Sequence, residues 1–166
     1  MAYPPVLPPT GRTNSTPQVD AHPSDHNTIA AALAAMPWGR VASAVNSGAA
    51  QTGIAATPTD LTGLSLTFTR IAGRVYHAML SLTLQAVGVQ ATANITVADG
   101  ANAVQHNPAV AIPANLYMQL TSLYVIPAGT GPLTLKLRGS IAGGTLSVLN
   151  GAANASSFVV YDVGPV

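Results

Sequence analysis

The pattern of apolar and polar positions changes near residue 38. From there to the C-terminus, apolar and polar residues alternate in short runs that are separated by Gly, Pro, Asn and Asp. In Arg74–Gln85 the even positions from Tyr76 to Leu84 are apolar, and the odd positions from His77 onward are polar except for Met79. A period of two residues is typical of a strand with one buried face. The segments 64–69 and 133–138 alternate in the same way.

Similar runs predict further strands at 39–46, 92–98, 116–126, 144–149 and 157–163. Turn-forming residues stand between them at 98–100, 128–132, 142–144 and 150–151. About eight short strands with no helix between them indicate a mainly β protein with an antiparallel β-sandwich. The sandwich is predicted to occupy residues 38–166.

Residues 1–23 show almost no periodic apolar pattern and are rich in proline. Six of the thirteen prolines lie here: Pro4, Pro5, Pro8, Pro9, Pro17 and Pro23. Such a segment favours extended backbone without hydrogen bonds of its own. We therefore predict a docking arm that binds a neighbouring subunit, with Pro4, Pro5, Pro8 and Pro9 among its contact residues.

A short helix is predicted at residues 24–37. Ser24 can cap it, Asp25 suits the positive end of the helix dipole, and Pro37 ends it. Ile29, Leu33 and Met36 form one apolar stripe. About three turns of helix are not stable alone, so this stripe must pack on something.

Four aromatic residues complete the predicted interface. Aromatic side chains that are spread over a sandwich pack in its core or between subunits more often than they bind a ligand. Together with the helix stripe and the four arm prolines, we therefore assign these four to an oligomer or docking interface: Trp38, Tyr76, Phe158 and Tyr161.

Composition points to an obligate oligomer. Charged residues make up 7% of the chain, hydrophobic residues 48%, and glutamate is absent. Soluble domains carry about 25% charged residues, and a monomer so poor in charge tends to associate. Insertion in a membrane is not expected, because apolar runs such as 29–35 are far shorter than the roughly 20 residues a spanning helix needs.

Other partner classes are disfavoured by the distribution of charge and cysteine. The six cations are scattered over the chain, whereas nucleic-acid binders concentrate theirs, so no nucleic-acid partner is expected. The lack of cysteine excludes disulfides and thiolate metal sites, in agreement with folding in a reducing cytoplasm. The N-terminal residues do not have the pattern of a signal peptide.

The stretch AHPSDHN, residues 21–27, is the best candidate for a metal site. His22 and His26 are four residues apart, but Pro23 lies between them and breaks the helical spacing of two ligands. A catalytic zinc also needs three protein ligands. We interpret Ser24 and Asp25 as a helix cap, and we retain His26 as a metal ligand only if its copies meet on a symmetry axis. No cofactor is expected.

Catalysis is not expected either. The five aspartates include no pair whose spacing suggests a shared site, and Asp60 and Asp99 stand in turn contexts. The sequence contains no nucleophile elbow and no Ser-x-x-Lys motif. The glycine pairs lack both the lysine and the helix that follow a phosphate-binding loop.

Two segments resemble known families. RTNSTPQVDAHPSDHNTIAAAL resembles the N-terminal segment of tailed-bacteriophage minor tail and fibre-like proteins, in which H-P-x-D-H-N opens a short helix before a β-rich head. Residues 124–165 are similar to the last strands of the trimeric jelly-roll heads of the tumour-necrosis-factor and complement superfamily. The shared features are the turn at Ala128-Gly129, the strand with Leu133, Leu135 and Leu137, and the closing strand Ser156–Val160.

The resemblance implies a bacteriophage virion protein with a jelly-roll domain, assembled as a homotrimer in the host cytoplasm. It would attach to other virion proteins of the capsid or tail, as a capsid decoration protein, a head fibre or a minor tail protein. The alternative is a tail module that binds a host receptor or surface glycan. Exposed Tyr and Asn side chains around Asn102–Asn107 or Asn150–Asn154 would favour that alternative.

Overall fold

The computed structural model describes residues 39–165. The predicted arm, the predicted helix, His26 and Trp38 lie outside the described residues. Between residues 39 and 165 the chain forms strands and connecting turns, and no helix. The strands are β1 (Gly39–Asn46), β2 (Gln51–Ile54), β3 (Thr59–Arg70), β4 (Arg74–Val87), β5 (Ala91–Asp99), β6 (Val104–His106), β7 (Ala109–Ile112), β8 (Tyr117–Ile126), β9 (Gly131–Ile141), β10 (Thr145–Leu149) and β11 (Ser156–Pro165).

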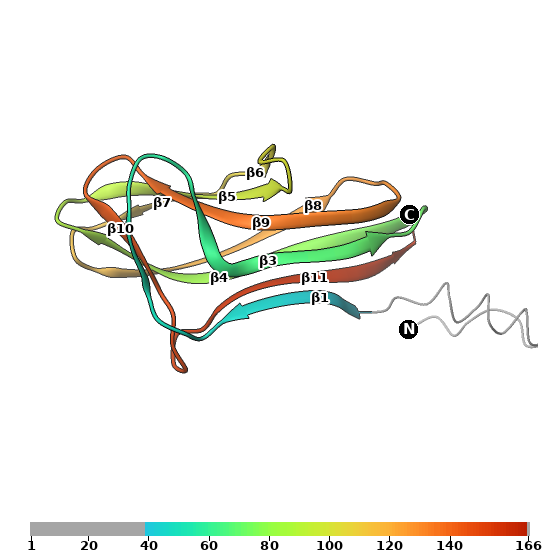
Figure 1. Ribbon diagram of the computed structural model, residues 1–166, viewed down its shortest axis with the longest axis horizontal. Helices are drawn as coiled ribbons and strands as arrows, with labels where there is room; N and C mark the ends of the chain where they lie inside the picture. Colours follow the sequence, from blue (N-terminus) through green and yellow to red (C-terminus); the bar gives the residue numbers. More distant parts are fainter. Residues whose placement is uncertain (1–38, 166) are drawn as a thin grey trace, which may run out of the picture. The chain divides into compact units, whose positions relative to one another are not determined.

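The strands form two antiparallel sheets, which confirms the predicted β-sandwich (Figure 1). Sheet A has the order β1-β11-β4-β10-β2, and β8 pairs with the other edge of β4. Sheet B has the order β3-β9-β5-β6, and β7 also pairs with β5. Strands from the start of the chain pair with strands from its end, β1 with β11 and β3 with β9. This nested order is the strand arrangement of a jelly roll.

The alternation in the sequence places the core between the two sheets. In β4 the side chains of even-numbered residues from Tyr76 to Ala86 are buried, whereas Met79 on the opposite face is 39% exposed. Leu66 of β3, Ile95 of β5 and Leu135 of β9 are buried on the facing side. Full burial of an aliphatic side chain contributes about 1.5–3 kcal/mol. The apolar faces of the strands therefore provide the main stabilisation of the sandwich.

The prediction was wrong for two interface residues. Tyr76 is 2% exposed and Phe158 is fully buried, and both belong to the core of the sandwich. Tyr76 packs against Phe68 with ring centroids 5.2 Å apart, and its hydroxyl accepts a hydrogen bond from the Ile71 amide. Aromatic side chains on inward positions of β4 and β11 face the other sheet, so they are not available to another subunit.

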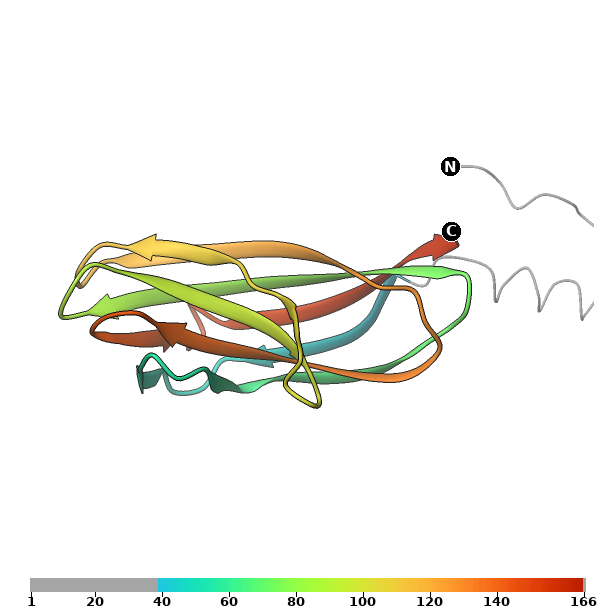
Figure 2. The same cartoon turned by 90° about the horizontal axis from the view of Figure 1, so that it is seen from above.

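The sandwich is closed on one side and open on the other. On the closed side β1 lies against β3, and Asn46 Nδ2 donates to the Thr62 carbonyl at 2.8 Å. The side chain of Gln51 of β2 bridges the sheets there. Its Nε2 donates to the Asp60 carbonyl, and its Oε1 accepts from the Thr62 backbone amide. On the open side, the edge strands are β8 of sheet A and the short strands β6 and β7 of sheet B. The view from above shows the long strands lying nearly along one axis and running in alternating directions (Figure 2).

Candidate assembly surface

The outer face of sheet A is made of the side chains of β1, β11, β4 and β8 that point away from sheet B. Register places Met79 between Val159 of β11 and Leu123 of β8. Two residues further along, His77 lies between Tyr161 and Val125. Cross-strand neighbours on one face of a sheet have Cβ atoms about 4.5–5.5 Å apart. These six side chains therefore form one continuous patch over three strands.

Much of this patch is exposed. Leu123 is 49% exposed, Val125 54% and Met79 39%, while Val159 and Tyr161 are half-buried. Val45 of β1, opposite Ser157, adds a side chain that is 58% exposed. Large contiguous apolar patches are uncommon on monomeric proteins and mark interaction sites. The outer face of sheet A is therefore the best candidate for a binding surface among residues 39–165.

The same face has almost no charge. Its outward positions carry Arg40 and His77, and in the described part of the chain none of them is a carboxylate. Asp162 of β11 is buried, and its Oδ2 is 2.7 Å from Arg74 Nε. Its other oxygen accepts a hydrogen bond from the Gly164 amide at 3.0 Å. The carboxylate is fully engaged within the domain, which leaves this face without a negative group.

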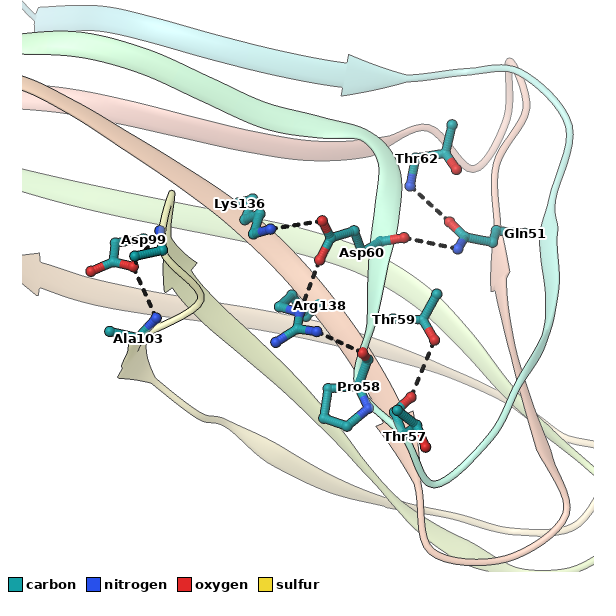
Figure 3. Close-up of polar contacts among 11 residues, drawn as sticks. Gln51, Thr57, Pro58, Thr59, Asp60, Thr62, Asp99, Ala103, Lys136 and Arg138 are labelled. Carbon is teal, nitrogen blue, oxygen red and sulfur yellow. Dashed lines mark hydrogen bonds and ion pairs between the residues drawn. The ribbon is translucent and has the colours of Figure 1, made fainter.

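The outer face of sheet B is polar. Ser65, Thr67 and Thr69 of β3 are exposed, and the Thr67 and Thr134 hydroxyls are 2.8 Å apart. Asp60 receives Lys136 Nζ at 2.8 Å and Arg138 Nε at 2.9 Å (Figure 3). The hydrogen bond from Lys136 is the main reason why the pKa of Asp60 is lowered, and both cations add to the effect. Arg138 also donates to the Pro58 carbonyl at 2.8 Å.

This cluster could not be predicted from spacing. The sequence placed Asp60 in a turn, but it lies in β3, paired with Arg138 of β9. Asp60 and Arg138 are 78 residues apart along the chain. Asp99, the other aspartate assigned to a turn, ends β5 and accepts hydrogen bonds from the Ala101 and Ala103 amides, which confirms that assignment.

A second polar group joins the sheets on the open side. His106 Nε2 of β6 lies 2.9 Å from Ser122 Oγ of β8, and its ring stacks on Tyr124 with centroids 5.5 Å apart. Gln105 accepts a bond from the Tyr124 hydroxyl and donates to Asp99. Burial raises the pKa of Tyr124. Asp99 accepts its hydrogen bonds from Gln105 and from the amides of Ala101 and Ala103, so it does not orient His106. The side chains of β6 and β8 therefore connect the two sheets here by a hydrogen bond and ring stacking.

The other site predictions concern metal binding and the asparagine-rich stretches. Among residues 39–165 no three His, Cys, Asp or Glu side chains are grouped to hold a metal ion, and His26 lies outside that range. No helix in that range is long and apolar enough to cross a membrane. In the asparagine-rich stretches Asn102, Asn107 and Asn154 are exposed, while Asn107 also accepts from Thr96 and Asn150 donates to the Ala49 carbonyl. The exposed tyrosine of β8, Tyr117, is on the outer face of sheet A.

Comparison with known proteins finds likeness in fold only. No protein-family model matches the chain, and no curated protein matches its sequence. The Eiger tumour necrosis factor of S. frugiperda superposes with a TM-score of 0.49 and 8% identity, over 77% of this chain and 95% of that one. The VP2 protein of infectious bursal disease virus (D431N mutant) gives 0.39 and 16%, over 77% and 37%. The enzymatically active domain of tailspike protein 4 of bacteriophage CBA120 gives 0.32 and 15%, over 73% and 19%.

Proposed function

We propose that this chain is a structural protein of a bacteriophage particle and that it assembles as a homotrimer through the outer face of sheet A. One observation carries the proposal. A face of four strands exposes Val45, Met79, Leu123 and Val125 and carries no carboxylate, in a chain with only 7% charged residues. Burial of apolar area contributes about 25 cal/mol per Å², so self-association would stabilise this surface.

The virion location rests on the sequence. The segment that contains AHPSDHN resembles the N-terminal part of phage tail and fibre-like proteins, in which a β-rich head follows, and here an antiparallel sandwich follows it. In this function the protein contributes a binding surface and no chemical reaction. The domain decorates or stabilises the particle, on the capsid or the tail, and residues 1–22 attach it there.

A mass measurement in solution tests the assembly. The full chain at micromolar concentration is expected at three times its mass of 16.7 kDa. Leu123→Lys should weaken association at least about 100-fold, because burial of an unpaired ammonium costs several kcal/mol and each 1.4 kcal/mol is a factor of ten. Thr67→Lys on the outer face of sheet B is the matched control and should leave the trimer intact. A monomeric wild type, or a Leu123→Lys variant that stays trimeric, would overturn the proposed interface.

Particle incorporation tests the location. Deletion of residues 1–22 should preserve the oligomer and abolish its incorporation into particles, which electron microscopy of purified particles can measure. Normal incorporation of the truncated chain would show that these residues are not the attachment.

A further inference from the structure

One edge of β8 is long and has no strand paired to it among residues 39–165. All ten residues of β8 pair in continuous register with β4, from Gln85 opposite Tyr117 to Tyr76 opposite Ile126. The strand YMQLTSLYVI contains no charge, no proline and no bulge. His106 and Gln105 of β6 contact Ser122 and Tyr124 through side chains, but no strand among residues 39–165 pairs with the main chain of this edge. Proteins normally protect such an edge with a charge, a proline or a bulge, because a long unpaired edge recruits another strand.

The other sheet edges in the described part are covered or short. The edge of β1 lies against β3, where Asn46 bonds the Thr62 carbonyl and its side chain lies 3.5 Å from the position of a Cβ at Gly63. In sheet B, β6 has three residues and β7 four. A neighbouring copy therefore cannot offer its β1 edge to β8 without first separating β1 from β3. The remaining candidates are the β8 edge of a second copy and a segment outside residues 39–165.

The N-terminal segment contains one stretch suited to this edge. A strand needs backbone amides, and proline has none. Within residues 1–23 the longest run without proline is Thr10–Thr16, TGRTNST, which is bounded by Pro9 and Pro17. Three of its seven residues are threonine, which favours strands. Its polar side chains also suit a strand at the margin of a sheet, where the facing layer ends.

Reach is sufficient for exchange between copies. Residues 17–38 separate this stretch from the start of β1. An extended chain spans about 3.3 Å per residue, and neighbouring strands lie about 4.8 Å apart. Even with residues 24–37 as a helix at about 1.5 Å per residue, the connection spans up to about 45 Å, several times the spacing of neighbouring strands.

We propose that Thr10–Thr16 of one copy adds as a strand to the free edge of β8 in a neighbouring copy. The inference rests on the proposed self-association, which brings a second copy close. Pairing of main-chain groups would supply affinity, as in other cases where an extended segment adds to a sheet edge. The arm would then add to the contact between outer faces, which by itself is expected to keep the copies associated.

Disulfide cross-linking tests this directly, because the natural chain has no cysteine. Thr121→Cys places a thiol at the middle of β8, on an exposed outward position. Single cysteines are then added at Arg12, Thr13, Asn14 or Ser15. Side chains of a strand alternate between faces, and in non-hydrogen-bonded pairs the cross-strand Cβ distance of about 4.5 Å reaches the upper end of the disulfide range. Alternate arm positions should therefore give covalent oligomers on a non-reducing denaturing gel, and the intervening positions should not.

Controls separate the possible occupants. Each variant must keep the wild-type mass under reducing conditions. Thr67→Cys on the outer face of sheet B, combined with the same arm cysteines, should give no cross-link. Thr121 lies on the face that is proposed to self-associate, so cross-linking by Thr121→Cys alone is the background that the arm cysteines must exceed. A link within one chain would assign the arm to its own domain. That result, or no cross-link above background at any arm position in an intact trimer, overturns the strand exchange and leaves the proposed function standing, whereas a monomeric wild type overturns the proposed function itself.

Discussion

The outer faces of the two sheets differ although both belong to long antiparallel strands of one domain. On sheet A, Met79 is flanked by Val159 and Leu123, and the carboxylate of β11 is buried. On sheet B, the corresponding positions carry serine, threonine and the cluster of Asp60, Lys136 and Arg138 (Figure 3). A sheet with one polar face is stable in water, whereas an apolar outer face gains stability when it is covered. The difference favours sheet A over sheet B as the surface of the proposed assembly.

The ion pairs of the two sheets show the same difference. In sheet A, the Arg74 and Asp162 side chains are 5% and 1% exposed. In sheet B, Asp60 is 54% exposed. The ion pair of sheet A is therefore buried, whereas that of sheet B is exposed. Substitutions in the buried ion pair, in the core and in the exposed ion pair are therefore expected to have effects of decreasing size.

The largest effect is expected for Asp162→Ala. Removal of one partner of a buried ion pair typically costs about 3–5 kcal/mol, because the other charge loses its compensation. The Gly164 amide would lose its acceptor as well. Chemical denaturation should show a loss of this size in the free energy of unfolding. A loss below about 1 kcal/mol would mean that water reaches the Arg74–Asp162 ion pair in solution.

A smaller effect is expected for Gly139→Ala. Gly139 of β9 faces sheet A, and an added Cβ would lie 3.1 Å from Leu61 Cδ2 and 3.4 Å from Leu146 Cδ2. Overpacking of a filled core typically costs about 1–3 kcal/mol. Thermal unfolding should occur at a lower temperature than in the wild type. Ala142→Ser, at an exposed position, serves as the control. Gly73→Ala is not suitable for this purpose, because a φ of 72° is itself unfavourable for alanine. An unchanged midpoint for Gly139→Ala would indicate that the two inner faces are less tightly packed than described.

The smallest effect is expected for Asp60→Asn. Exposed ion pairs contribute about 0–1 kcal/mol, so the free energy of unfolding at neutral pH should fall by no more than that. The pKa of Asp60 is lower in the folded chain than in the unfolded chain, mainly because of the hydrogen bond from Lys136. Its contribution is thus complete above the ordinary carboxyl pKa of about 4 and is lost as the pH falls through the lower folded pKa. The stability difference between wild type and variant should shrink below about pH 4 and in high salt, and a difference independent of both would contradict the electrostatic explanation.

Alternation predicted most of the fold. The strand predicted at 39–46 coincides with β1, and the strands predicted around 64–69, 74–85, 92–98, 116–126, 133–138, 144–149 and 157–163 all lie within or overlap observed strands. Three strands were missed, β2, β6 and β7, because runs of three or four residues are too short to show a period. Met79 was identified as the apolar exception on its face, and this exception became the centre of the candidate surface.

By itself, the sequence determined the class of the fold and the two faces of each strand, because the side-chain period of a strand is a local property of the backbone. Only the tertiary structure decided which strands are neighbours. That choice buried Tyr76 and Phe158 instead of leaving them for another subunit, and it brought Lys136 and Arg138 to Asp60. It also left β8 with one unpaired edge. Strand pairing joins residues far apart in the chain, and no local pattern encodes the partner.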